Sequence, residues 1–249
     1  MRAPKRVLIL GATSAMAQEA ARLWAAQGAR IGLLARDEGR LAVIADDLVT
    51  RGASEIVTVP CDCAKAESVT ALDEIAARFG GLDIVLLAYG VLSDQTMLEQ
   101  NPNALADLLQ VNFVSAALWC QAASNLLEKQ TFGSLVVIGS VAGDRGRQSN
   151  YVYGAAKAGL GVLVQGIAHR LARNGGGARA VLIKPGFVDT PMTAGFSKGP
   201  LWASAEQLGK IIVAAAENGK AIVYAPGFWR LIMLVIRSVP ARIFHKTRL

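Results

Sequence analysis

A tyrosine and a lysine lie four residues apart in the segment Tyr153-Gly-Ala-Ala-Lys157, and Ser140 ends an apolar run thirteen residues before the tyrosine. Positions i and i+4 share one face of a helix, so we expect the lysine ammonium beside the phenol. A nearby positive charge favours the phenolate and lowers the tyrosine pKa from its ordinary value of about 10. Such a phenol can exchange a proton with a carbonyl or an alcohol, with the Ser140 hydroxyl holding the same oxygen.

Carbonyl reduction also requires a hydride carrier, and the N-terminal segment has the pattern of a phosphate cradle. The apolar run Arg6–Leu10 predicts a buried strand, a turn of small residues spans Gly11 to Ala17, and a helix pattern runs from about Ser14 to Gln27. A strand, a tight turn and a helix N-terminus in this order bind the pyrophosphate of a dinucleotide. For this segment alone, an ordinary strand-to-helix turn remains the alternative.

Strand and helix patterns alternate along the whole chain, which predicts an α/β fold with a parallel sheet covered on both faces. Its ligand is expected outside the carboxyl ends of the strands, where the motifs above fall. The 249 residues contain no linker or repeat, so we expect one domain over 1–249. The strand patterns are Val7–Leu10, Arg30–Leu34, Ile56–Pro60, Ile84–Ala88, Leu135–Gly139, Ala180–Lys184 and Ala221–Tyr224.

Composition limits the class of protein. Three cysteines without disulfide or metal spacing, and only two histidines, favour a reducing cytoplasm and predict no metal site. The net charge of +7 is compatible with an anionic substrate or membrane. No nucleic-acid recognition module is present, so we expect no nucleic-acid partner.

Taken together, these segments resemble the short-chain dehydrogenase/reductase family over nearly the whole chain. The resemblance implies a single-domain Rossmann fold with a seven-stranded parallel sheet, NAD(P)-dependent exchange between a ketone and an alcohol, and a homo-oligomer. Two departures from the family pattern stand out: Ala15 and Ala17 replace glycines of the cofactor loop, and Leu87-Ala-Tyr-Gly90 replaces an Asn-Asn-Ala-Gly motif. The implied catalytic residues are Ser140, Tyr153, Lys157 and Asn112, the last anchoring a water that relays protons.

The same resemblance implies the cofactor contacts. Lys157 would hold the nicotinamide ribose, Thr190 the carboxamide, and Asp62 the adenine. The full set of implied cofactor-binding residues is Gly11, Thr13, Ser14, Ala15, Met16, Arg36, Asp62, Cys63, Ala88, Gly90, Tyr153, Lys157, Pro185, Gly186, Val188 and Thr190.

The residue that ends the second strand indicates which nicotinamide cofactor is used. An acidic side chain there would accept from the ribose 2′-hydroxyl and repel a 2′-phosphate. This chain instead has Ala35 followed by Arg36, with Arg40 nearby, and a guanidinium suits a phosphate. We therefore favour NADP(H) over NAD(H). The alternative is that Arg36 is merely solvated and Asp37 contacts the ribose of NAD.

Two segments bear on the substrate. The loop from Val141 to Asn150 carries Arg145 and Arg147, which either face a phosphate or sugar or are simply solvated. An apolar and basic C-terminal extension spans 226–249. The two segments resemble one branch of the family, the reductases of decaprenylphosphoryl 2-keto-ribose, which implies a lipid-linked ketosugar substrate and a partner oxidase that makes it.

Three interpretations of the C-terminal extension remain open: it closes over the substrate or packs in a subunit interface, it lies on the inner membrane surface as a peripheral contact, or it packs in the core. Arg230 and Arg237 fall on one narrow stripe of the predicted helix. The apolar stretch is too short to span a bilayer. Alternatives for function are a reductase of another soluble or amphiphilic ketone, or a catalytically silent NADP-binding subunit.

Overall fold

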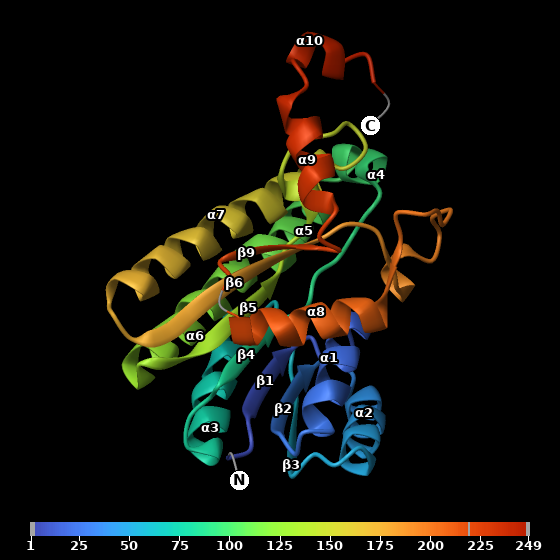
Figure 1. Ribbon diagram of the computed structural model, residues 1–249. Helices are drawn as coiled ribbons and strands as arrows, with labels where there is room; N and C mark the ends of the chain where they lie inside the picture. Colours follow the sequence, from blue (N-terminus) through green and yellow to red (C-terminus); the bar gives the residue numbers. More distant parts are fainter. Residues whose placement is uncertain (1–2, 219, 248–249) are drawn as a thin grey trace.

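Seven parallel strands form one twisted sheet at the centre of the computed structural model, which describes residues 3–218 and 220–247 (Figure 1). The strand order is β3-β2-β1-β4-β5-β6-β9, so the chain reverses its direction of winding between β1 and β4. Parallel neighbours need crossover connections, and helices supply them on both faces. The strands are β1 Arg6–Leu10, β2 Arg30–Ala35, β3 Glu55–Pro60, β4 Ile84–Leu87, β5 Phe132–Ile138, β6 Gly177–Pro185 and β9 Ile222–Ala225.

These seven strands confirm the seven predicted from apolar runs, with ends that differ by up to three residues. A separate two-stranded pair, β7 Val188–Asp189 and β8 Ala203–Ser204, was not predicted. The helices of three or more turns are α2 Glu38–Thr50, α6 Ser115–Gln130, α7 Tyr151–Arg173, α8 Ala205–Asn218 and α1 Ala15–Ala25. Shorter helices are α3 Thr70–Phe79, α4 Gln95–Gln100, α5 Pro102–Leu109, α9 Trp229–Ser238 and α10 Ala241–Phe244.

The sheet separates two apolar cores because successive side chains of a strand point to opposite faces. On β1, Val7 and Ile9 pack in the core beneath α1, α2 and α8, whereas Leu8 and Leu10 pack in the core beneath α3, α6 and α7. Both faces of the central strands are therefore buried, which explains why their sequences are continuous apolar runs rather than alternating patterns.

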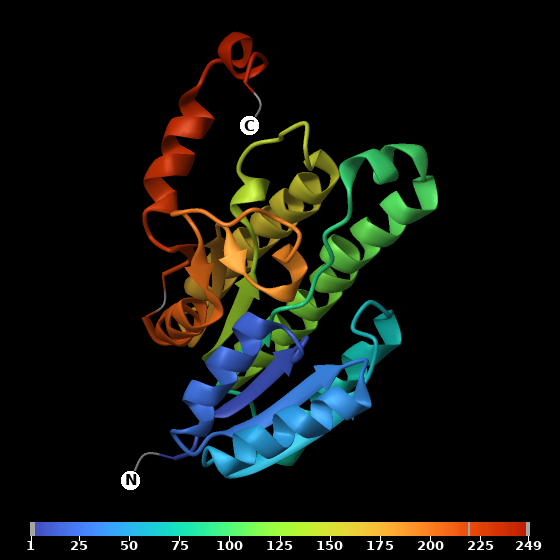
Figure 2. The same cartoon turned by 90° about the vertical axis from the view of Figure 1, so that its right-hand side faces the viewer.

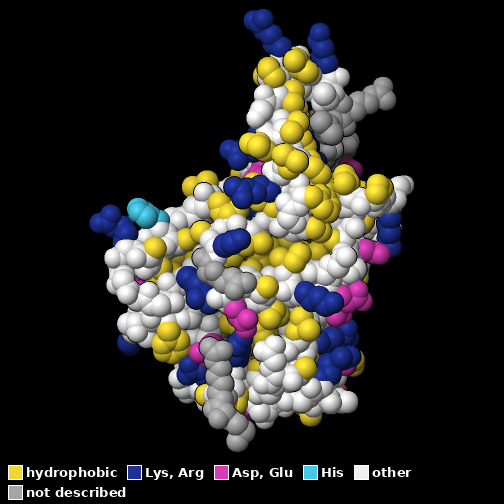
Figure 3. Space-filling view, viewed as in Figure 1, with side chains coloured by type: hydrophobic (Ala, Val, Ile, Leu, Met, Phe, Trp, Pro, Cys, Tyr) yellow, Lys and Arg dark blue, Asp and Glu magenta, His cyan; other side chains and the backbone are white. Residues whose placement is uncertain are grey.

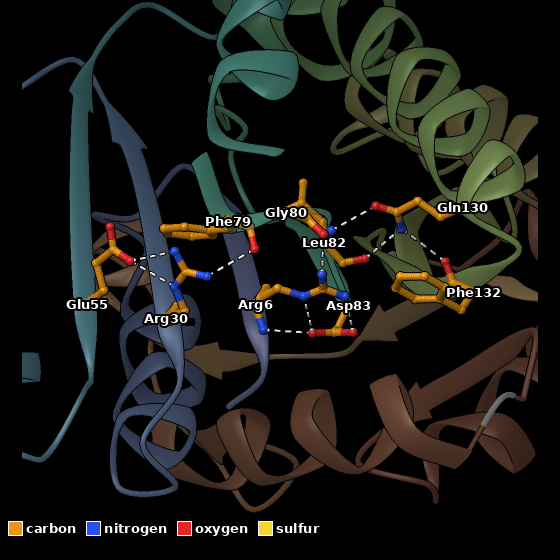
Figure 4. Close-up of polar contacts among 9 residues, drawn as sticks. All are labelled: Arg6, Arg30, Glu55, Phe79, Gly80, Leu82, Asp83, Gln130 and Phe132. Atoms are coloured by element: carbon orange, nitrogen blue, oxygen red, sulfur yellow. Dashed lines mark hydrogen bonds and ion pairs between the residues drawn. The ribbon is translucent and has the colours of Figure 1, made fainter. Parts of the chain in front are cut away.

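Polar contacts fix the amino ends of the central strands, at the edge of the sheet away from the predicted site (Figure 4). The Arg6 guanidinium and backbone N–H donate to the Asp83 carboxylate, each at 2.9 Å. Burial alone would raise the pKa of Asp83, but the hydrogen bonds from Arg6 outweigh it and hold that pKa below its ordinary value. The Gln130 amide bonds both the N–H and the carbonyl of Leu82. The end of α6 is thereby joined to the start of β4.

The C-terminal helices α9 and α10 project from the body of the domain (Figures 1 and 2). The Arg145 guanidinium fixes α9 by donating to the carbonyls of Ile236, Arg237 and Val239 and by stacking over the Phe244 ring at 3.8 Å. It therefore caps the C-terminus of α9, where cations are favourable. Within the described residues, no helix is long and apolar enough to cross a bilayer. Arg248, part of the predicted basic end, lies outside them.

Candidate active site

A cleft of about 800 Å³ opens at the carboxyl ends of the strands. Its lining includes every residue for which a cofactor contact was predicted, together with Ser140. These residues come from the carboxyl ends of six strands, β1 to β6, and from α1 and α7. The alternation of strands and helices therefore brings segments that are distant in the sequence to one edge of the sheet, as expected for this topology.

The turn after β1 is built for close approach. Gly11 has a φ of +84°, and a Cβ at this position would lie 2.6 Å from Cβ of Tyr89. The Gly11 and Ala12 amides donate to the Leu34 carbonyl at 2.9 Å, which ties the turn to β2. The N-terminus of α1 faces the cleft, and the Ser14 side chain does not cap it. Unpaired amides at a helix N-terminus are suited to a pyrophosphate, so the residues fit a dinucleotide despite Ala15 and Ala17.

The second departure from the family pattern has a packing explanation. The Tyr89 ring packs with the apolar core beneath α6, and its hydroxyl lies 2.9 Å from Oγ of Ser115. Burial raises the pKa of the Tyr89 phenol, so this tyrosine stays neutral. Tyr89 therefore fills the floor of the cleft beside Gly11.

Asn112 lies behind the cleft rather than on its lining. It sits in a single π-helical turn, Gln110–Val114, between α5 and α6. Its amide oxygen accepts from the Val91 N–H at 3.0 Å, and its amide nitrogen donates to the Val91 carbonyl at 2.8 Å. A Cβ on Gly90 would fall 2.6 Å from that amide oxygen. In this structure the Asn112 side chain therefore positions the loop after β4, and the water-anchoring role stays a prediction.

Ser140, Tyr153 and Lys157 meet where β5 ends and α7 begins. The Lys157 side chain is only 5% exposed, and its ammonium donates to the Ile138 carbonyl at 3.1 Å. Its Nζ lies 5.9 Å from the centroid of the Tyr153 ring. The Ser140 hydroxyl accepts from the Ala142 N–H at 3.0 Å.

The pKa of the Tyr153 phenol differs from the expectation drawn from the sequence. Burial raises the pKa of the Tyr153 phenol, and the nearby Ser140 hydroxyl offsets part of that rise. Burial lowers the pKa of Lys157 to about 8. The expectation that the Tyr153 pKa is lowered toward neutrality is therefore wrong for this structure, because loss of solvation, the largest cause, raises it.

The end of β2 presents two arginines to the cleft. Arg36 and Arg40 both line it. The Asp37 carboxylate accepts from the Arg40 N–H at 3.0 Å and is the N-cap of α2. Asp37 thus has a structural partner, which weakens the alternative in which it contacts a ribose.

Aromatic side chains form the opposite wall. The Phe187 ring stacks on Trp202 with centroids 5.4 Å apart and meets Trp229 edge-on at 5.5 Å. Trp229 packs against Gly186 so closely that a Cβ there would lie 1.9 Å from the indole. The sequence left open that the C-terminal extension closes over the substrate, and Trp229 does line the cleft. The contact of Trp229 with the turn after β6 was not predicted, because nothing local links the two.

Polar groups without partners also line the cleft. Among the described residues, Gln95 Nε2, Asn150 Oδ1 and Trp229 Nε1 are buried and make no hydrogen bond, and all three residues line the cleft. Arg147 also lines the cleft, and burial lowers its pKa. Arg145, predicted with it as a contact for a phosphate or sugar, points instead to α9.

Comparisons with known proteins agree with this geometry. The sequence model of the short chain dehydrogenase family matches residues 5–200. An uncharacterized oxidoreductase of Streptomyces coelicolor is 36% identical over 98% of this chain and 96% of its own length. An uncharacterized oxidoreductase of Mycobacterium tuberculosis strain H37Rv is 33% identical over 96% of each chain. The crystal structure of levodione reductase has the same fold, with a TM-score of 0.81 at 21% identity over 93% of this chain and 99% of that chain.

The buried ammonium leads to a pH prediction. Lys157 has a pKa of about 8 in the folded protein and an ordinary value of 10.5. Between these pH values the unfolded chain binds a proton at Lys157 that the folded chain has released, so raising the pH stabilises the folded state. The free energy of unfolding of the native sequence, measured relative to that of Lys157→Met, should therefore rise by about 3 kcal/mol over this range. Urea unfolding at several pH values measures this difference.

Lys210→Met is the matched control, because Lys210 is exposed on α8. The difference in unfolding free energy between Lys210→Met and the native sequence should stay nearly constant over the same pH range. If the difference in unfolding free energy between the native sequence and Lys157→Met does not change with pH, the Lys157 ammonium is solvated in the folded protein.

Proposed function

The chain belongs to the short-chain dehydrogenase family, and from that premise we propose that it is an NADPH-dependent reductase of an amphiphilic ketone bearing an anionic group. The family membership makes the chain an oxidoreductase. Cofactor choice, substrate class and residue roles are our proposals, supported by the cleft.

The residues at the end of β5 and the start of α7 supply the proton chemistry. The raised pKa keeps the Tyr153 phenol protonated at neutral pH, which suits it to donate its proton to a carbonyl oxygen as that oxygen gains electrons. The Ser140 hydroxyl lies near the Tyr153 phenol and can donate a hydrogen bond to the same carbonyl oxygen of the substrate. Lys157, held by the Ile138 carbonyl, places a positive charge next to the developing phenolate. When bound, a reduced nicotinamide supplies the hydride.

The choice of NADPH rests on the end of β2. Arg36 and Arg40 face the cleft, and no carboxylate in the described part of the chain forms an ion pair with either. Asp37, the acid nearest in sequence, is engaged as a helix cap. Two free guanidinium groups favour a ribose 2′-phosphate over a 2′-hydroxyl.

One observation carries the substrate class: Arg147 is half-buried in the cleft, and none of its guanidinium nitrogens has a hydrogen-bond or ion-pair partner among the described residues. A half-buried guanidinium without a partner in the described part of the protein is well placed to pair with a bound anion. The wall of Phe187 and Trp229 offers apolar contact in the same cleft. Together they favour a substrate with a phosphate and an apolar chain.

A polyprenylphosphoryl 2-keto-sugar has both features, and the motif resemblance to reductases of decaprenylphosphoryl 2-keto-ribose supports it. Such a ketone would be supplied by a partner oxidase that acts on the parent alcohol. We also propose a homo-oligomer in the cytoplasm, with peripheral contact to the inner membrane face through the C-terminal helices.

Replacing Arg36 tests the cofactor proposal. Arg36→Ala removes a charge-assisted contact, so NADPH affinity should fall by about tenfold or more while NADH affinity stays the same. Fluorescence titration with both nucleotides measures this, with Arg173→Ala on the distant end of α7 as the control. Equal losses for both nucleotides, or none, would contradict NADPH selection.

Replacing Arg147 tests the substrate proposal. With Arg147→Gln, KM should rise roughly tenfold or more for a polyprenylphosphoryl keto-pentose, because the anion loses its charged partner. A neutral ketone with the same apolar chain should be reduced with unchanged KM. If KM rises equally for both ketones, Arg147 shapes the cleft and does not recognise an anion.

A further inference from the structure

A second cavity, of about 820 Å³, lies behind the catalytic helix, between α7, the edge strand β9 and α9. Four cationic side chains reach its lining in addition to Lys157: Lys184 from β6, Lys220 from the segment before β9, and Arg230 and Arg237 from α9. Among the described residues of the lining, the one carboxylate belongs to Asp144. The proposed reduction uses none of these five residues.

Asp144 does not neutralise this cluster, because its charge is already paired. Its side chain is 2% exposed, forms an ion pair with Lys184 and accepts from the Tyr224 hydroxyl at 2.7 Å. Burial and this carboxylate raise the pKa of Tyr224 to about 12. Three cations remain, and in the part of the chain that the structure describes no carboxylate lies within ion-pair distance of Lys220, Arg230 or Arg237. The cavity is therefore suited to an anion.

The helix that borders this cavity has a second, solvent-facing apolar surface. Trp229 and Met233 bury the inner face of α9. Leu231, Leu234 and Val235 on its outer face are 67%, 63% and 59% exposed. At 100° per residue, Arg230 and Arg237 lie on the flank between the two faces. Figure 3 shows apolar side chains running up the projecting C-terminal segment, with cationic side chains near its base and at its tip.

Nearly all the net charge of the protein belongs to this region. Residues 218–249 contain six Lys or Arg and no Asp or Glu, whereas residues 1–217 contain 20 basic and 19 acidic residues. A cationic apolar helix is complementary to an anionic lipid surface. A second copy of the chain fits poorly, because a two-fold contact would place this cationic region against itself.

We propose that α9 docks on an anionic phospholipid surface, with a headgroup phosphate in the cavity beside Arg230 and Arg237 and with Leu231 and Leu234 among the acyl chains. The inference rests on the peripheral membrane contact proposed above and adds to it a defined headgroup site. It does not depend on the reductase chemistry. Because Trp229 of the same helix lines the catalytic cleft, docking would hold the cleft mouth close to the lipid.

The experiment is co-sedimentation of the full chain with vesicles of phosphatidylcholine, alone or mixed with phosphatidylglycerol. We expect binding to the mixed vesicles only. Arg230→Gln/Arg237→Gln should weaken that binding roughly 30-fold. Lys129→Gln/Lys210→Gln removes the same charge from exposed positions on α6 and α8 and should bind like the native sequence. Circular dichroism of each variant confirms that it is folded.

Two further arms separate the sources of phosphate. Soluble glycerol phosphate should raise the melting temperature of the native protein more than that of Arg230→Gln/Arg237→Gln, because both proteins keep Arg36, Arg40 and Arg147 in the other cleft. Leu231→Gln/Leu234→Gln should keep this response and lose vesicle binding.

Three results would overturn the proposal. If the native protein never sediments with the mixed vesicles, α9 does not dock on lipid, even if glycerol phosphate binds. If the two double charge variants lose binding equally, the attraction is non-specific. If Arg230→Gln/Arg237→Gln binds normally, the cavity holds no headgroup. All three readouts are independent of turnover, so none of these results bears on the reductase proposal.

Discussion

The burial of the Lys157 ammonium is the constraint on which the rest of the site depends. A buried cation needs a hydrogen-bonding partner, and here the partner is the Ile138 carbonyl at the end of β5. The same strand leads two residues later to Ser140, so the contact that holds the lysine also sets where the serine lies. Glycines make this approach possible: a Cβ on Gly143 would lie 2.8 Å from the α7 backbone, and one on Gly154 would lie 3.0 Å from the Ala142 carbonyl. The turn after β5 and the helix α7 therefore form one packed unit.

Much of the fold and of the cofactor cleft could be predicted from the sequence, because those features depend on local patterns. Apolar runs such as Val7–Leu10 identify strands whatever lies beside them, and the parallel topology then brings Gly11, Ser140 and Pro185 to one edge. The alanine-substituted loop keeps Gly11, the glycine whose close approach to Tyr89 leaves no room for a Cβ.

The features that could not be predicted depend on distant contacts or on burial. Arg145 caps a helix more than ninety residues later in the chain, and no local pattern indicates that. The contact between Trp229 and Gly186 is of the same kind. The Tyr153 pKa was wrongly predicted because helix spacing gives the distance to Lys157 but not the loss of solvation that both groups share. The position of α9 is also a product of distant contacts. This helix borders two cavities, with Trp229 on the side of the catalytic cleft and Arg230 on the side of the cationic cavity.

The central claim is that Tyr153 donates a proton in ketone reduction, and one comparison tests it most directly. Tyr153→Phe and Tyr151→Phe each remove one phenol hydroxyl, at positions two residues apart. Tyr151 lies outside the cleft, and its hydroxyl donates to the Glu99 carboxylate. NADPH oxidation is measured with an amphiphilic ketone that the native protein reduces. The account predicts that Tyr153→Phe loses about 100-fold or more in kcat with NADPH affinity unchanged, whereas Tyr151→Phe stays near the native rate. If Tyr153→Phe keeps a rate close to that of Tyr151→Phe, the proton comes from another group and the account is wrong.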